Sequence, residues 1–151
     1  MSSLSPVELL KFQPNRYPFL MIDSVTDYEP GKFANGFKNL TWNEWYFPVH
    51  FDGAPNLPGA LQLEAMAQML TVAVTTTEGL AGMVTHALEH RVKFKKELIP
   101  GMRLDIHTQV ESWKRGICKG SGKILVGGEL ACEAKMVIAI PEILDSYLPR
   151  K

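Results

Sequence analysis

The sequence predicts an α+β domain in which one antiparallel sheet curls around a single long helix. Three observations lead to this prediction. Residues 58–77 have the pattern of a helix that is buried on nearly every side, strand-like segments joined by short turns follow it, and 151 residues suit one domain. No internal repeat, low-complexity segment or linker divides the chain, so residues 1–151 are expected to form a single domain.

The elements expected before the long helix are short. Serine at the cap, proline at the first helical position and glutamate at the third form a capping box in Ser5-Pro6-Val7-Glu8, which predicts a helix start. Residues 19–27 and 32–41 are predicted strands, separated by a turn at Glu29-Pro30-Gly31. Residues 43–58 are punctuated by proline and glycine and are expected to be irregular.

The long helix of residues 58–77 ends near Gly79 and carries one narrow polar stripe. The stripe consists of Glu64, Gln68, Thr71 and Thr75, whose spacings of four, three and four place them on one side of the helix. Neighbours, a partner or water could satisfy this stripe, or it could line a cleft. Gln68 lies one turn after Glu64 and is placed to orient its carboxyl group by a hydrogen bond.

Four further strands are predicted after the helix. They span residues 83–98, 102–113, 117–126 and 129–140, and the breaks between them are Pro100-Gly101, Lys114-Arg115-Gly116 and Gly127-Gly128. Parallel neighbours need long crossovers, so these short links favour antiparallel pairing, with two of them tight enough for hairpins.

Composition excludes several classes of function. Sixteen basic residues balance sixteen acidic ones, so a bulk electrostatic case for nucleic acid binding is absent. No apolar run approaches the roughly 18 residues that cross a membrane, and residues 1–10 lack the features of a signal peptide. Cys118 and Cys132 form no CxxC pair and are expected to be reduced thiols of a cytoplasmic protein. The charged share of 21% weakly indicates that another subunit covers part of the surface.

Three groups are candidates for acid–base chemistry. Desolvation favours the protonated form of a carboxyl group, which suits Glu64 to donate a proton near neutral pH. His50 lies in the irregular segment that leads into the helix, and a neutral imidazole can accept a proton. Gly59 stands in the first helical turn, where backbone N–H groups have no helical partner and a ligand can approach closely. A base, an acid and an oxyanion donor are therefore expected to converge.

The segment from His50 to Gln68 reads HFDGAPNLPGALQLEAMAQ. It closely resembles the active-site signature of the 3-hydroxyacyl-(acyl carrier protein) dehydratases of the FabZ type, in which His-Phe-Pro-Gly is followed by Pro, by Pro-Gly and by Glu-Ala-Met-Ala-Gln. Residues 16–23 resemble the N-terminal motif of that family, and Asn43-Glu44, Phe94 and Pro100-Gly101 fall in its order. The resemblance extends from about residue 13 to residue 140, and fourteen positions separate the histidine from the glutamate.

The resemblance implies a hot-dog fold, with the sheet wrapped around the central helix, and a homodimer whose active sites lie at the interface. His50 of one subunit would face Glu64 of the other, and such dimers often assemble into a trimer of dimers. The implied reaction removes water from a (3R)-3-hydroxyacyl thioester to give a trans-2-enoyl thioester. His50 would take the C2 proton, the Gly59 N–H would meet the thioester oxygen, and Glu64 or a water that it orders would protonate the C3 oxygen. Glutamate at 64, where related dehydratase/isomerases carry aspartate, favours dehydration without isomerisation.

The resemblance also implies the partners. The acyl carrier protein brings the substrate on its own phosphopantetheine arm, and neither a metal nor a redox cofactor is required. That carrier is acidic, and Arg91, Lys93 and Lys95 alternate along one predicted strand with Lys96 following, so they could form a basic docking patch. An ordinary edge strand guarded by lysines explains the same pattern equally well.

The chain departs from the family pattern at four positions. Val49 replaces a usual glycine, Asp52 a usual proline, Ala60 a common valine and Asn15 a common histidine. The two changes beside His50 could alter the loop that positions it, and they point to a divergent member that serves a specialised acyl pathway. A hot-dog thioesterase that activates water with Glu64 stays open as an alternative, as does a non-catalytic acyl-binding protein.

Other candidates for chemistry are weaker. His86 and His90, with Glu89 between them, would lie about 13 Å apart on a strand at roughly 3.3 Å per residue, too far to share a metal ion. The remaining candidates are best explained by packing or by an interface: His107, Trp42, Trp45 and Trp113.

Overall fold

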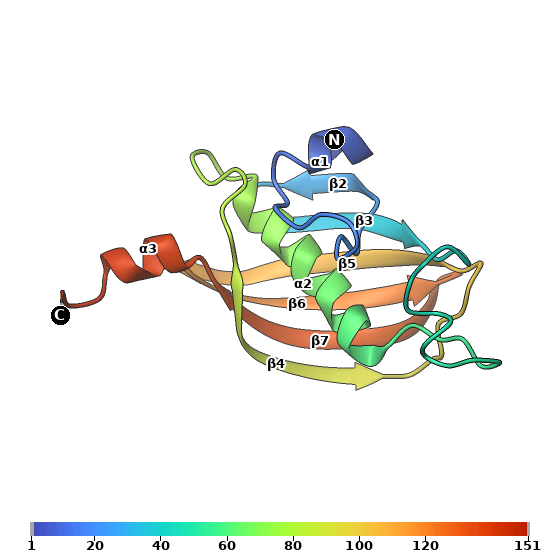
Figure 1. The fold of residues 1–151 in the computed structure, drawn as a ribbon. Coiled ribbons are helices and arrows are strands. Elements are labelled where there is room, and N and C mark those ends of the chain that lie inside the picture. The colour runs from blue at the N-terminus through green and yellow to red at the C-terminus, as the bar shows by residue number, and fades with distance from the viewer. Residues whose placement is uncertain (1, 151) are drawn as a thin grey trace.

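One antiparallel sheet of seven strands and one long helix make up most of the structure, a computed structural model that describes residues 2–150 (Figure 1). The strands lie in the order β1-β2-β3-β5-β6-β7-β4, and every neighbouring pair is antiparallel. The elements in chain order are β1 (Ser2–Leu4), α1 (Pro6–Leu9), β2 (Ser24–Glu29), β3 (Phe33–Asn39), α2 (Gly59–Thr75), β4 (His86–Phe94), β5 (Arg103–Lys114), β6 (Ile117–Val126), β7 (Glu129–Ala139) and α3 (Pro141–Ser146). This confirms the predicted α+β architecture.

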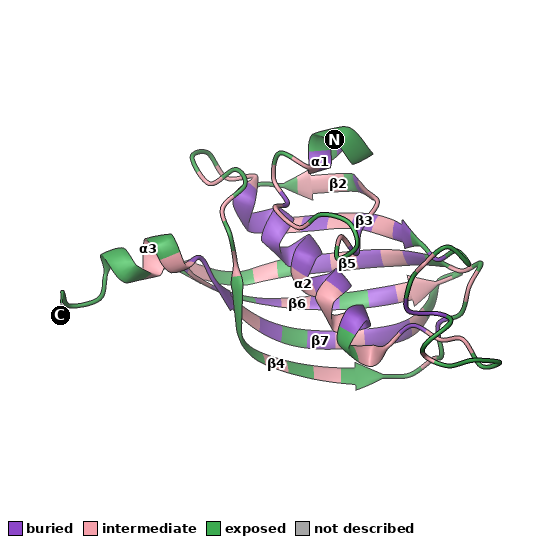
Figure 2. Ribbon diagram, in the orientation of Figure 1, coloured by how far each residue is buried: buried purple, intermediate pink, exposed green. Residues whose placement is uncertain are grey.

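Helix α2 lies against one face of the sheet, which curves around it (Figure 1). Twelve of its seventeen residues are buried, as its apolar pattern predicts, and the purple segments of α2 in Figure 2 show this. Glycines in the facing strands let the helix approach closely. A Cβ atom on Gly120 would lie 2.7 Å from Leu70 Cδ1, and one on Gly36 would lie 2.7 Å from Met69 Cε.

The two hairpins predicted in the second half of the chain are confirmed. β5 and β6 are joined at Arg115 and Gly116, with φ angles of 52° and 83°, and β6 and β7 at Gly127 and Gly128, with φ angles of 58° and 81°. Two successive positive φ angles are typical of the type I′ turn, whose twist matches that of the flanking strands. Among residues 2–150, no helix is long and apolar enough to cross a membrane.

Residues 19–23 are not the first half of a strand, so the predicted boundary there is wrong. β2 begins at Ser24, because the backbone of the preceding segment bonds to a side chain of α2: the Met21 N–H donates to Gln68 Oε1 at 2.8 Å and the Phe19 carbonyl accepts from Gln68 Nε2 at 2.8 Å. β4 is also shorter than expected, covering residues 86–94 of the predicted 83–98. Strand β1 and helix α3 were not predicted.

Strand β4 forms one edge of the sheet and pairs only with β7. Seven of its nine residues are exposed, which is visible as the mostly green strand in Figure 2. Leu88 and Phe94 are 53% and 51% exposed, although both are large and apolar. An unprotected edge of this length presents unpaired N–H and C=O groups to whatever lies beside it.

Candidate active site

The first turn of α2 presents an unused backbone donor. The cap position is Pro58, which offers no side-chain hydrogen bond, and within the described residues no acceptor is recorded for the Gly59 N–H. The absence of a side chain matters here, because a Cβ atom on Gly59 would lie 2.7 Å from Cζ of Phe94. Phe94, at the end of β4, therefore packs against the helix start, and the helix dipole favours negative charge beside the free N–H.

Glu64 is held by the hydrogen bond that the sequence predicts. Gln68 Nε2 donates to Glu64 Oε1 at 2.9 Å. The amide of Gln68 has only one possible orientation, because its oxygen accepts from the Met21 N–H while its nitrogen donates to the Phe19 carbonyl. Since Gln68 must donate to Oε1, a proton carried by Glu64 belongs on Oε2, for which no partner is recorded among residues 2–150.

The rest of the polar stripe is satisfied within the chain. Thr71 Oγ1 lies 2.7 Å from Thr85 Oγ1, and Thr75 Oγ1 donates to the Phe12 carbonyl at 2.9 Å. Satisfaction by neighbours, one of the two explanations open at the sequence level, is therefore correct for both threonines. Glu64 differs from them in having an oxygen, Oε2, for which no hydrogen-bond partner occurs within residues 2–150.

His50 lies in the irregular segment between β3 and α2, half-buried, with its ring held by the backbone. Its Nδ1 lies 3.1 Å from the carbonyl oxygen of Asn56, and the Asn56 N–H donates to the His50 carbonyl at 2.9 Å. A carbonyl can only accept, so the Asn56 oxygen assigns the proton to Nδ1 and leaves Nε2 as the free basic atom. The Phe51 ring stacks on the imidazole at 4.2 Å, and the peptide bond between the two residues is cis.

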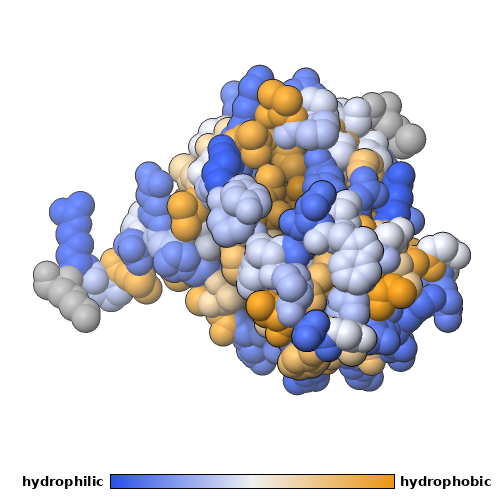
Figure 3. Space-filling model, turned by 45° about the vertical axis from the view of Figure 1, so that its right-hand side comes forward, coloured by the Kyte–Doolittle hydropathy of each residue, from blue (hydrophilic) through white to orange (hydrophobic). Residues whose placement is uncertain are grey.

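The two candidate groups have different hydrogen-bond partners within one chain. No hydrogen bond joins His50 to Glu64 in residues 2–150; their partners are Asn56 and Gln68. Large apolar side chains in and just before the irregular segment that carries His50 are open to solvent: Trp42 is 71% exposed, Val49 66% and Phe51 57%. Figure 3, which brings the right-hand side of Figure 1 forward, shows hydrophobic side chains reaching the surface among hydrophilic ones.

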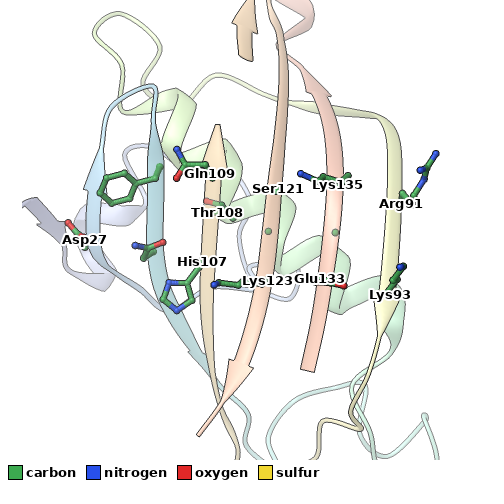
Figure 4. Close-up of a pocket in the computed structure, with 14 residues that line it drawn as sticks. Asp27, Arg91, Lys93, His107, Thr108, Gln109, Ser121, Lys123, Glu133 and Lys135 are labelled. Atoms are coloured by element: carbon green, nitrogen blue, oxygen red, sulfur yellow. The ribbon is translucent and has the colours of Figure 1, made fainter. Parts of the chain in front are cut away.

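The four basic candidates are divided between two places. Arg91 and Lys93 share one face of β4, as predicted, and it is the sheet face turned away from α2 (Figure 4). They line a groove of about 830 Å³ there with Lys123, Lys135 and His107, where Asp27 and Glu133 offset much of the positive charge. Lys95 and Lys96 follow the strand, and Lys96 Nζ lies 2.9 Å from Glu129 Oε2.

Other residues singled out in the sequence have packing or surface positions. His86 and His90 both lie in strand β4, and no group of three potential metal ligands occurs among residues 2–150. Burial lowers the pKa of His107, the Lys123 ammonium lowers it further, and the Asp105 carboxylate acts in the opposite direction. Trp113 packs against the core, while the Trp45 indole donates to the Pro18 carbonyl at 3.1 Å.

Both cysteines are free and buried. Burial, assisted by the Glu111 carboxylate, raises the pKa of the Cys118 thiol to about 12. Burial and the Glu133 carboxylate raise that of Cys132 to about 11. Neither thiol has the low pKa of a reactive nucleophile, so neither is a candidate catalytic group.

Two parts of this site were not found from the sequence. The Asn56 carbonyl that orients His50 belongs to the backbone, so the residue type at position 56 does not predict this contact. Lys38 was also missed: its side chain is only 8% exposed, and its Nζ lies 2.7 Å from Glu44 Oε1 and 3.6 Å from Asp23 Oδ1. The Asn43-Glu44 motif drew attention to Glu44, but nothing in the sequence identified Lys38 as the cation that pairs with it.

An antiparallel sheet wrapped around one long helix defines the hot-dog fold. The fold is shared with a chain of the dehydratase heterocomplex ApeI:P from Xenorhabdus doucetiae, with a TM-score of 0.77, 18% identity, and coverage of 94% of this chain and 97% of that one. A hypothetical thioesterase from Streptococcus pneumoniae with coenzyme A has a TM-score of 0.59 at 13% identity, covering 77% and 86% of the two chains. At these identities the likeness concerns the fold alone.

Sequence comparison gives the family. The profile of the FabA-like domain matches residues 13–135, and the chain belongs to that family. It is 39% identical over 133 residues to the 3-hydroxyacyl-(acyl carrier protein) dehydratase FabZ of Moorella thermoacetica, covering 87% of this chain and 93% of the relative. It is 41% identical over 140 residues to the protein of the same name from Chloroflexus aggregans, covering 92% and 97%.

Proposed function

We propose that this protein is a dehydratase that converts (3R)-3-hydroxyacyl thioesters of acyl carrier protein into trans-2-enoyl thioesters in fatty acid or related acyl-chain biosynthesis. One observation carries the proposal: the chain presents a histidine with a free Nε2, a glutamate with a free Oε2 and an unpaired N–H on Gly59. The two relatives of about 40% identity, both named 3-hydroxyacyl-(acyl carrier protein) dehydratase FabZ, support the reaction. No metal or redox cofactor is part of the proposed reaction.

The proposed chemistry assigns one step to each group. Nε2 of His50 takes the proton from C2 while the Gly59 N–H stabilises the negative charge that develops on the thioester oxygen. The bond between C3 and its oxygen then breaks, and the departing hydroxide takes the proton from Oε2 of Glu64 and leaves as water. His50 ends as an imidazolium and Glu64 as a carboxylate, and proton transfer from one to the other restores both.

We propose that the working unit is a homodimer, with His50 of one chain opposite Glu64 of the other, and that these dimers assemble further into a trimer of dimers. Within one chain His50 and Glu64 each have their own hydrogen-bond partner and are not bonded to each other, which is compatible with this arrangement. The unpaired edge of β4 and the exposed apolar side chains at Trp42, Val49 and Phe51 support the dimer, since such groups are usually covered.

The proposed protein partner is an acyl carrier protein, which delivers the substrate on its phosphopantetheine arm. Lys95 and Lys96 come directly after Phe94, the last residue of β4, and the Phe94 ring packs on Gly59, the proposed catalytic donor. Arg91 and Lys93 would meet the carrier only from the opposite sheet face. The buried thiols of Cys118 and Cys132 fit a reducing compartment, and we propose the cytoplasm as the location.

An assay with 3-hydroxyacyl and enoyl thioesters of acyl carrier protein tests the reaction. Enoyl absorbance and free thiol are followed together. Interconversion of the two thioesters without thiol release is the expected result. Thiol release would identify a thioesterase, and tight binding without either change would identify an acyl-binding protein. His50→Ala and Glu64→Gln should each abolish dehydration while the circular dichroism spectrum stays unchanged.

Mixing the two inactive variants tests the shared site. In a mixed dimer of a His50→Ala chain and a Glu64→Gln chain, one site keeps both catalytic groups and the other has neither. Co-refolding equal amounts should therefore restore about a quarter of the wild-type activity per chain, because random pairing yields mixed dimers half of the time. Activity that stays at the level of the separate variants would place both groups in the same chain's site.

A further inference from the structure

Lys38 is a buried cation in strand β3. The side chain of this lysine is 8% exposed, and its ammonium meets two carboxylates, Glu44 at 2.7 Å and Asp23 at 3.6 Å. Taking charges out of water is costly, and a well-packed apolar side chain in such a place is often as stable or more so. Stability therefore does not explain a charged side chain at this position. The explanation lies in the chain segments that the two ion pairs hold in place.

The two carboxylates belong to the two segments that support the proposed acid and base. Asp23 ends the segment whose Met21 N–H and Phe19 carbonyl fix the amide of Gln68, and Gln68 in turn holds Glu64. Glu44 lies at the beginning of the irregular segment that carries His50. Lys38 thus connects both supports to one point of the sheet.

Two further hydrogen bonds and one buried side chain lie at this junction. Asp23 Oδ2 also accepts from the Asn39 N–H at 2.7 Å, and Trp45 donates from the loop of His50 to the Pro18 carbonyl. Tyr46 is fully buried next to Glu44, and its hydroxyl has no hydrogen-bond partner among the described residues. Burial together with the carboxylates of Glu44 and Asp23 raises the pKa of Tyr46, so this hydroxyl stays neutral.

We propose that Lys38 is a positioning residue for the reaction proposed above, acting through Glu44 on His50 and through Asp23 on the Gln68–Glu64 pair. Without its charge, two carboxylates are left close together without a cation between them, and both segments lose a common anchor. The inference rests on the proposed dehydratase function for its kinetic consequences. The orientation of the His50 ring is a consequence that can be measured without turnover.

The test compares Lys38→Met, Lys38→Arg and the control Lys32→Met. Lys32 pairs with Glu29 on the surface and is 64% exposed, so its replacement removes an ion pair of the same type without a buried partner. Dehydration kinetics give kcat and KM, and long-range ¹H–¹⁵N spectra of the imidazole report whether the proton of His50 stays on Nδ1. The His50→Ala spectrum assigns the signal.

Lys38→Met should lower kcat by about 10- to 100-fold with little change in KM, as expected when catalytic groups are displaced by about 1 Å. It should also shift the His50 ring signals, because the bond to the Asn56 carbonyl loosens. Lys38→Arg should keep most of the wild-type kcat and most of the wild-type His50 signals. Lys32→Met should match the wild type in both measurements. Folded Lys38→Met with kcat within twofold of wild type and an unchanged His50 spectrum would overturn the inference.

A second variant keeps the test decisive if Lys38→Met does not fold. Glu44→Gln retains a hydrogen-bond acceptor for Lys38 but removes the charge, and it should give a smaller loss of kcat with the same shift of the His50 signals. Unchanged signals and kcat in Glu44→Gln would also overturn the inference. If the wild-type protein fails to dehydrate thioesters, the proposed function fails, while the His50 spectra still decide the role of Lys38.

Discussion

Replacing Gln68 with methionine tests how the structure holds the proposed acid. The substitution keeps a side chain of similar length and removes three hydrogen bonds: those to the Met21 N–H, to the Phe19 carbonyl and to Glu64. Methionine adapts its shape to the space left by the amide, so no large cavity is expected. The loss therefore comes from polar groups that no longer have partners.

The magnitude follows from how accessible those groups are. Met21 is 2% exposed, so its N–H is left without water, at a cost of about 1–3 kcal/mol. Phe19 is 43% exposed and Glu64 is only half-buried, so water replaces their lost bonds at a cost of about 1 kcal/mol in all. Together these costs lower the free energy of unfolding by about 3 kcal/mol, or the melting temperature by about 6–12 °C for a chain of this size.

Activity should fall as well, because Glu64 loses the donor that fixes its Oε1. A fall in kcat of about 10- to 100-fold with a small change in KM is expected, since orientation and not substrate binding is affected. Gln62→Met is the matched control: Gln62 is 5% exposed in the same helix, but it makes one hydrogen bond, to the Leu57 carbonyl, and its Oε1 has no partner. It should lose less stability and keep its kcat.

Thermal melting at fixed protein concentration and steady-state kinetics on acyl carrier protein thioesters provide both readouts. Gln68→Met with the melting temperature and kcat of the wild type would refute the reasoning. Equal losses in Gln68→Met and Gln62→Met would also refute it, because they would assign the effect to burial in α2 and not to the specific partners of Gln68.

Four further predictions concern stability and reactivity. Because burial raises the pKa of Cys118 to about 12 and of Cys132 to about 11, both thiols should resist alkylation at pH 8 and react on unfolding in guanidinium; rapid native labelling would contradict this. The same shifts predict stability that is present below about pH 8.5 and declines as the pH rises through these values, which melting curves would show. The lowered pKa of His107 predicts stability that is lost as the pH falls below about 6.5, and His107→Gln should flatten the acidic limb of the melting-temperature profile. Gly120→Ala should lower the free energy of unfolding by about 1–3 kcal/mol, since its Cβ would lie 2.7 Å from the Gln109 oxygen and from Leu70, whereas Ser121→Ala should have almost no effect on the denaturation midpoint.

The sequence predicts correctly those elements that are determined by a local pattern of residues. The twelve buried residues of α2 and the positive-φ turns at Arg115-Gly116 and Gly127-Gly128 repeat a local pattern, so the periodicity and the turn residues suffice. The segment at residues 19–23 has strand-like composition, but its Met21 N–H and Phe19 carbonyl bond to Gln68, which is 47 and 49 positions away from them. No local pattern contains that information.

The candidate site also has contacts that a local pattern predicts and contacts that it does not. The bond between Gln68 and Glu64 follows from one helical turn and was predicted. The bond between His50 and the Asn56 carbonyl depends on the path of an irregular loop, and the ion pairs of Lys38 join three segments. Contacts of this kind require the folded chain, and they are also the contacts that orient the proposed catalytic groups.

The departures from the family pattern beside His50 can now be judged by what they touch. The loop is held largely by backbone bonds: Phe51 and Ala54 exchange N–H to carbonyl bonds at 3.0 and 2.9 Å, and the Asn56 N–H donates to the His50 carbonyl. Val49 is 66% exposed, and Asp52 is exposed with no recorded hydrogen bond from its side chain. Since neither side chain takes part in the bonds that orient His50, valine at 49 and aspartate at 52 are compatible with a base in working position. Because both side chains are exposed, any specialisation they bring concerns the surface that a second chain or the carrier would contact. Because they leave the bonds of His50 intact, they favour a divergent dehydratase over a protein that has lost catalysis.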